Sequence, residues 1–253
     1  MIEEDFINKI FPQKCGDNLL VIEKTNEKVS KSSLYRCKFL NKICEVKALK
    51  QHIKTGSVAN YLIPSVCSIG YLGLGKYNKK DYKCIYSIWI HLLQRCYDIK
   101  CDRYKVYGNK FITVCEEWHN FQNFASWYEN NIKWNTENYK LELDKDILCN
   151  VLHKDIKIYS PETCLLIPEE LNVFLTGDTK NCGLNFINNK YYPNIQFNKE
   201  RKYLGVFSSF KEAKQVYAEE KYKIWKELIN KYNLPINIKE ILLKYDFNWS
   251  WIN

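Results

Sequence analysis

Hydrophobic and polar residues alternate along the first part of the chain in the manner of β-strands. Between Asn18 and Ala48, runs rich in β-branched and aromatic residues are separated by polar turn formers, which is typical of short antiparallel strands. Further along, apolar residues recur at every third or fourth position over residues 86–97 and 118–131. This spacing indicates two helices that each place one side against a core.

The pattern is clearest between residues 183 and 231. It predicts three strands, at 184–187, 191–197 and 201–207, followed by a helix with Ser208 or Ser209 as its N-cap. Period-two alternation in the middle strand places one set of side chains on the face that meets this helix and the other set on the opposite face. The core-facing set is Tyr191, Pro193, Ile195 and Phe197, and the opposite set begins with Tyr192, Asn194 and Gln196.

Composition excludes several classes of protein. With 253 residues, 46% of them hydrophobic and 26% charged, the chain can bury a sizeable core. No stretch approaches the roughly 18 consecutive apolar residues of a membrane-spanning helix, so we expect no membrane contact. The acidic N-terminus does not resemble an export signal, and we therefore expect a cytoplasmic protein. None of the eleven cysteines forms a C-x2-C pair, so free thiols are expected and zinc is not favoured.

Charge is distributed unevenly along the chain. The net charge is +9, and residues 31–83 alone hold eleven Lys and Arg against Glu45 and Asp81. Residues 128–178 are acidic and residues 179–253 are basic again. Two basic segments around an acidic one suit a polyanion held at both ends with metal-attracting carboxylates between them. The alternative is a set of solvated lysine faces without a ligand.

The C-terminal pattern resembles a known DNA-binding domain. The stretch G-L-N-F, K-Y-Y-P-N-I, K-Y-L-G-V-F and K-E-A within residues 183–217 is similar to the Apetala-type domain of plant ethylene-response factors, which also occurs in phage and bacterial homing endonucleases. The resemblance covers about 45 residues and implies that the free face of the sheet contacts double-stranded DNA. The DNA-facing positions that it implies are Asn185, Tyr192, Asn194, Gln196, Arg201 and Tyr203.

The side chains on this face indicate which base pairs it would contact. It offers amides, tyrosines and a single arginine, and Asn or Gln pairs with adenine in the major groove as Arg does with guanine. We therefore expect A·T-rich DNA. The alternative is a small structural cap whose polar sheet face meets only water.

The central segment resembles phage-encoded HNH-type proteins. Over close to 90 residues it presents, in order, W-I-H-L-L-Q-R-C-Y, V-Y-G, V-C-E-E-W-H-N-F-Q-N-F, L-D-K-D-I-L, Y-S-P-E-T-C and a closing asparagine. The resemblance implies a ββα-metal site in which Mg2+ or Mn2+ is held by Asp144 and Asn172. It places Lys145 at the position of the general-base histidine and Thr163 at that of the asparagine that braces the hairpin.

The residue at the general-base position departs from the HNH pattern, because Lys145 stands in place of a histidine. Lysine accepts a proton near neutral pH only when its pKa is strongly lowered. Asp146 is a further candidate to activate water or to add a ligand. His153 and His119 are alternatives outside the motif position.

These patterns together predict an α+β chain. A basic β-rich module is expected at 1–78, a central HNH-like ββα-metal domain at 79–178, an Apetala-type domain of three strands and a helix at 181–232, and a tail at 233–253. Two functions fit: a metal-dependent, site-selective DNA endonuclease or nickase of homing type, and a catalytically inactive DNA-binding protein on a decayed HNH scaffold. RNA binding is a third candidate, and it rests only on the 15% aromatic content.

Overall fold

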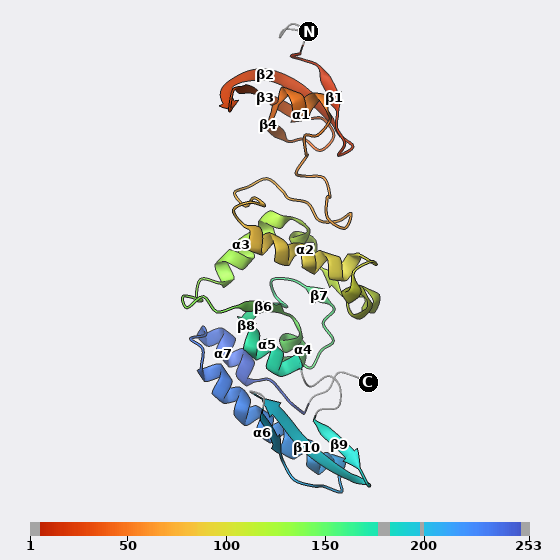
Figure 1. The fold of residues 1–253 in the computed structure, drawn as a ribbon, viewed down its shortest axis with the longest axis vertical. Helices are drawn as coiled ribbons and strands as arrows, with labels where there is room; N and C mark the ends of the chain where they lie inside the picture. The colour runs from red at the N-terminus through yellow and green to blue at the C-terminus, as the bar shows by residue number, and fades with distance from the viewer. Residues whose placement is uncertain (1–5, 177–182, 198–199, 249–253) are drawn as a thin grey trace. The chain divides into compact units, whose positions relative to one another are not determined.

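A computed structural model of the chain describes residues 6–176, 183–197 and 200–248 (Figure 1). This part of the chain combines helices with several small sheets, in agreement with the expected α+β class. Among the described residues, no helix has both the length and the apolar character needed to cross a membrane. The chain divides into two compact units, residues 1–110 with 116–126 and residues 111–115 with 127–253.

The first unit begins with a four-stranded antiparallel sheet whose strands lie in chain order. The strands are β1 (Ile10–Pro12), β2 (Asn18–Val29), β3 (Ser32–Phe39) and β4 (Glu45–Leu49), and the short helix α1 (Lys50–Lys54) follows. Alternate residues of the strands enter the core, as a period of two requires. This core contains Leu19, Val21, Tyr35, Cys37, Phe39, Ala48 and Ile53. The strands expected between Asn18 and Ala48 are confirmed.

A buried carboxylate fixes the turn between β3 and β4. Asp17 accepts hydrogen bonds from the backbone N–H groups of Asn18, Asn41 and Lys42 at 2.7, 3.0 and 3.0 Å, and from Nδ2 of Asn60 at 2.9 Å. Burial alone would raise the pKa of Asp17, but these hydrogen bonds outweigh it and lower the pKa. Asp17 is thus a structural acid whose acceptor positions are occupied by the fold.

The helices of the first unit surround buried tryptophans. The helices are α2 (Lys83–Tyr97), η2 (Asp102–Val106), η3 (Gly108–Lys110), η4 (Glu116–His119) and α3 (Phe121–Asn131), the last of which continues into the second unit. Nε1 of Trp89 donates to the backbone oxygen of Trp118 at 2.6 Å. The helix expected at 86–97 is confirmed. The one expected at 118–131 begins three residues later, because residues up to His119 form the separate turn η4.

The first half of the second unit is built from two small sheets and two helices. Its elements are β5 (Thr113–Val114), β6 (Leu141–Asp144), α4 (Asp146–Val151), β7 (Ile158–Tyr159), β8 (Leu165–Pro168) and α5 (Glu169–Thr176). β6 pairs with β8 in antiparallel fashion and β5 pairs with β7 in parallel. Two antiparallel strands are therefore followed directly by a helix.

The second half of this unit is the three-stranded meander that the alternation predicted, although its third strand ends at Tyr203 and not at residue 207. β9 (Leu184–Ile187), β10 (Lys190–Phe197) and β11 (Glu200–Tyr203) form an antiparallel sheet with β10 in the middle, followed by α6 (Phe210–Asn230) and α7 (Ile236–Leu243). The hydroxyl of Ser209, one of the two serines that the sequence left open as N-cap, accepts from the N–H of Glu212 and caps α6. One core joins both halves, since Ile167, Leu171 and Phe174 pack with Trp225, Leu228 and Ile229.

Candidate metal centre and nucleic-acid interface

The antiparallel pair of β6 and β8, which are joined through α4 and β7, carries the first candidate ligand at one end. Asp144 is the last residue of β6 and lies opposite Leu165, the first residue of β8. At the other end of this pair Pro168 leads directly into α5, where the N–H of Glu169 donates to the backbone oxygen of Lys140 at 2.9 Å. Helix α5 packs against both strands. Asp144 and α5 are thus parts of one ββα arrangement.

The groups around Asp144 shift the pKa of its carboxyl in opposite directions. Its Oδ1 accepts a hydrogen bond from the N–H of Ile147 at 2.8 Å, in the first turn of α4, so the side chain acts as a helix cap. Burial, followed by the nearby carboxylate of Asp146, raises the pKa of Asp144 to about 7, although the N–H of Ile147 and the ammonium of Lys145 oppose this. A carboxylate held in this environment is stabilised by a bound cation.

Lys145 is buried, with 3% of its side chain exposed, and its Nζ forms an ion pair with Oδ1 of Asp146. The ammonium also lies 5.8 Å from the centre of the Tyr159 ring. Burial opposes the charge, but the carboxylate of Asp146 outweighs it and the pKa of Lys145 is raised above its ordinary value. Lys145 therefore keeps its proton at neutral pH, which favours a role in positioning Asp146 over a role as general base.

Thr163 ties together the loop that precedes β8. Its hydroxyl donates to the backbone oxygen of Ile158 at 2.7 Å and accepts from the N–H of Ser160 at 2.9 Å. These bonds tie the loop that precedes β8 to Ile158 of β7. The bracing role that the resemblance to HNH-type proteins implies for Thr163 stays a prediction.

Asn172 lies on α5 away from the buried side of that helix. Leu171 and Leu175 enter the core, whereas Asn172 is half-buried. Within the described residues its amide has no hydrogen-bond partner. Three residues earlier on the same flank, Glu169 pairs with Lys140, which immediately precedes β6. The flank that carries Asn172 therefore meets the chain at the start of β6, whereas Asp144 is the last residue of that strand.

The donor set restricts the kind of cation that would fit. Groups of three or more His, Cys, Asp or Glu side chains that could hold a metal are absent from the described residues. A cation between Asp144 and Asn172 would have one carboxylate and one amide oxygen from the protein. Such a set suits Mg2+, which retains several waters and binds phosphate oxygens.

The two histidines considered as alternative bases lie outside β6, β8 and α5. His153 follows α4, is exposed, and its Nε2 lies 3.5 Å from Oδ2 of Asp246. His119 belongs to the first unit, where its ring meets that of Tyr97. Tyr159, the aromatic neighbour of Lys145, was missed by the sequence analysis, because it is fourteen residues away along the chain with no motif to connect the two.

The C-terminal sheet has two chemically different faces. The rings of Tyr191 and Phe210 meet at 5.5 Å, and Nζ of Lys202 pairs with Glu220 of α6 at 2.6 Å, so this face meets the helix as predicted. The opposite face carries cross-strand pairs that α6 does not cover. These pairs are Asn185 with Tyr192, Gln196 with Arg201, and Asn194 with Tyr203.

Exposure divides the six predicted DNA-facing residues. Asn185, Gln196 and Arg201 are exposed and Tyr192 is half-buried, while Tyr203 is 68% exposed. Asn194 differs from the expectation: it is only 8% exposed and its Nδ2 donates to the backbone oxygen of Gly183 at 2.9 Å. Its amide therefore binds the backbone of Gly183, which immediately precedes β9.

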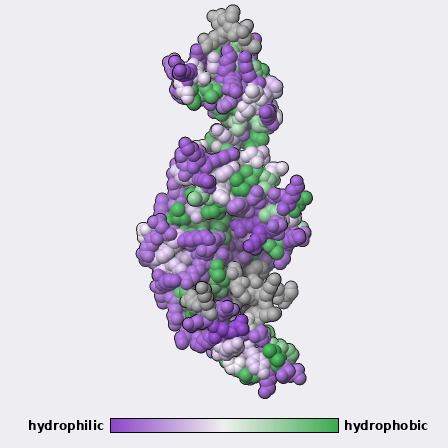
Figure 2. Space-filling model, in the orientation of Figure 1, coloured by the Kyte–Doolittle hydropathy of each residue, from purple (hydrophilic) through white to green (hydrophobic). Residues whose placement is uncertain are grey.

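The tip of the sheet also exposes apolar side chains. Phe186 and Ile187 are 57% and 55% exposed, and hydrophobic surface is visible at the bottom of Figure 2, where β9 and β10 lie. The ring of Phe186 is packed against Tyr191 at 4.7 Å, so part of this surface stabilises the sheet itself.

Comparison of the chain with protein-family models, with curated proteins and with solved structures found no match.

Proposed function

We propose that this chain binds double-stranded DNA through the exposed face of its C-terminal sheet and cleaves or nicks it near the selected site in a Mg2+- or Mn2+-dependent reaction. The observation that carries the DNA-binding part is the face of Asn185, Gln196, Arg201 and Tyr203, which lies opposite α6. A twisted antiparallel sheet with amide and basic side chains fits the major groove. The amides favour A·T base pairs.

The nuclease part rests on the ββα arrangement, which resembles the metal site of HNH-type proteins. Asp144 and Asn172 would hold the cation, and the cation would polarise the scissile phosphate and stabilise the leaving oxygen. The exposed part of Asp146 accepts the proton of the attacking water. Lys145 holds that carboxylate in place through its buried ion pair.

One observation favours the alternative of a DNA-binding protein without cleavage. The ion pair keeps Lys145 protonated, and Lys145 stands at the position of the base histidine in the HNH pattern. In this alternative Asp144 is only the cap of α4 and no metal is needed.

Cleavage of A·T-rich plasmid DNA in Mg2+ and in Mn2+ tests the proposal. Nicking that depends on the cation and is lost in Asp144→Ala supports the endonuclease. Salt-dependent DNA binding without cleavage in either cation supports the alternative. Failure to bind duplex DNA at all, or stronger competition by single-stranded RNA, rejects both.

A further inference from the structure

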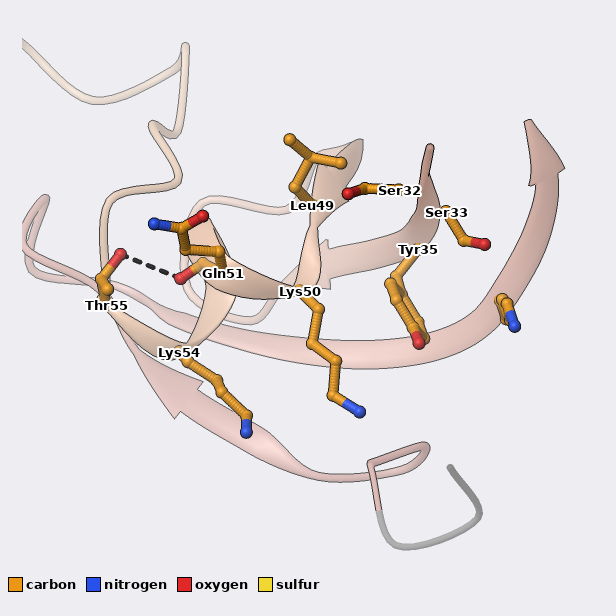
Figure 3. A pocket seen from close by; sticks show the side chains of 9 residues that line it. Ser32, Ser33, Tyr35, Leu49, Lys50, Gln51, Lys54 and Thr55 are labelled. Atoms are coloured by element: carbon orange, nitrogen blue, oxygen red, sulfur yellow. Dashed lines mark hydrogen bonds between the residues drawn. The ribbon is translucent and has the colours of Figure 1, made fainter. Parts of the chain in front are cut away.

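The sheet of the first unit has a hollow on the side where α1 lies. β4 pairs with β3 only from Leu34 to Lys38, so the β2–β3 hairpin extends beyond it and curves past the helix. Between them is a hollow of about 590 Å³, shown in Figure 3. It is lined by Lys24, Ser32, Ser33, Tyr35, Leu49, Lys50, Gln51, Lys54 and Thr55.

The lysines that line this hollow come from two elements, Lys24 from β2 and Lys50 and Lys54 from α1. Lys50 and Lys54 are four residues apart on α1 and therefore share one side of it. Figure 3 shows both side chains extending in the same direction as the hydroxyl of Tyr35. Lys24 is the cross-strand partner of Tyr35 in β2 and so shares its face. The ammonium of Lys50 lies 4.8 Å from the ring of Phe6, a cation–π contact that steadies it.

Acidic side chains of the sheet are held on its other face. Arg36 donates to the carboxylates of Glu23 and Glu45, at 2.8 and 3.2 Å, and Lys47 pairs with Glu27. Arg36 neighbours Tyr35 along β3 and hence points to the opposite face. None of the nine residues around the hollow is acidic. Glu23 and Glu45 are thus paired on the face opposite to Tyr35, whereas Lys50 and Lys54 line the hollow.

The chemistry of the lining matches the sugar–phosphate backbone. Lysine, serine, threonine, glutamine and tyrosine are the side chains that bind phosphate oxygens without reading sequence. An unpaired RNA strand would need exposed rings for stacking, but the only ring here, Tyr35, is 4% exposed. A protein interface would need an apolar or aromatic centre, and the hollow has only Leu49.

We infer that this hollow is a second DNA contact, which holds the phosphate backbone of a duplex while the C-terminal sheet reads the bases. This inference rests on the proposed binding of DNA but not on cleavage. It gives a role to two of the lysines within the basic segment 31–83, Lys50 and Lys54, which line the hollow. Each lysine that neutralises a phosphate contributes about 0.9 to the slope of log affinity against log salt.

The test measures the salt dependence with which the full chain binds a short duplex of random sequence. Lys50→Gln with Lys54→Gln should weaken binding at low salt and reduce the slope by about 1.8. The matched control is Lys38→Gln with Lys42→Gln, which removes the same charge from the opposite face and from the β3–β4 turn and should change the slope less than half as much. Because Lys50 also contacts Phe6, Lys54→Gln alone is measured as well, with an expected reduction of about 0.9, and thermal unfolding checks the fold of each variant.

An unchanged slope in the double variant, or an equal loss in the control, would overturn the inference. So would wild-type protein that fails to bind random duplex or prefers single-stranded RNA. The proposed function is judged separately by site preference and cleavage. A loss of slope without any site preference or cleavage supports this surface and rejects that function, whereas an unchanged slope in a protein that cleaves does the reverse.

Discussion

Lys145 and Asp146 are neighbours in the chain and form an ion pair in which the lysine is buried and the aspartate is half exposed. The pair stands at the end of β6, next to Asp144, and the ring of Tyr159 lies 5.8 Å from the ammonium. A lysine in this position keeps its charge and orients a carboxylate toward the surface. The relationship separates the roles of three consecutive residues: a candidate ligand, a positioning cation and a candidate proton acceptor.

These roles predict different effects of two substitutions on cleavage. Asp146→Asn should lower the cleavage rate by the roughly 100-fold to 10,000-fold that loss of a general base brings. Lys145→Met, which keeps the buried volume, should cost less, because the protonated lysine takes no proton. Single-turnover rates in Mg2+ measure both. The reverse order would identify Lys145 as the base.

Two substitutions of Asp144 separate its role as a helix cap from a role in metal binding. Asp144→Ala removes the cap of α4 and should destabilise the protein by about 1 kcal/mol, whereas Asp144→Asn retains an N-capping side chain and should be nearly neutral. Cleavage should be lost in both variants if Asp144 holds the cation. Urea unfolding and plasmid nicking measure the two effects. Full activity in Asp144→Asn would restrict Asp144 to capping.

The raised pKa of Asp144 predicts how stability depends on pH. A carboxyl with a folded-state pKa of about 7, above its ordinary 3.8, binds its proton more tightly when folded. Its contribution to stability is therefore present at low pH and is lost as the pH rises through about 7. Asp144→Asn lacks this titration, so its stability relative to wild type should increase between pH 5.5 and 8.5 in urea unfolding without metal. Added Mg2+ should stabilise the wild type at the higher pH and leave Asp144→Asn unchanged.

Local patterns predicted much of the fold. Alternation gave the strands around Val21 and Cys37 and the two faces of β10, and the capping rule gave Ser209, because these features depend on neighbouring residues. The pairing of β6 with β8 joins residues more than twenty positions apart, and the resemblance to HNH-type proteins was needed to suggest it.

The chemistry of the site was less predictable, because it depends on contacts between residues that are far apart in the chain. Period two places Asn194 on the free face, but it does not indicate that Gly183 returns to cover it. Charge counting marked residues 31–83 as basic, but only the fold shows that Lys50 and Lys54 share a hollow while Arg36 is paired on the other face. For Asn194 and Arg36, burial and contacts with residues distant in the chain determine whether the side chain is available to a ligand.

Thr163 should contribute to stability through its hydroxyl. Thr163→Val keeps the shape but removes the hydrogen bonds to Ile158 and Ser160, and should destabilise the protein by about 1 to 2 kcal/mol. Thr163→Ser, which retains the hydroxyl, should recover most of this difference in urea unfolding. Equal stability of the two variants would show that the loop does not depend on these bonds.

The contrast between Asn194 and Gln196 tests which amides read DNA. Gln196→Ala removes an exposed amide, and it should weaken the preference for adenine at one position by about 1 to 3 kcal/mol with little change in stability. Asn194→Ala removes the hydrogen bond to Gly183, and it should reduce stability by about 1 kcal/mol while the selected sequence stays the same. Selection of bound duplexes from a random pool, with thermal unfolding of each variant, measures both effects. If Asn194→Ala altered the selected bases and Gln196→Ala did not, the sheet would contact DNA by another route than its exposed face.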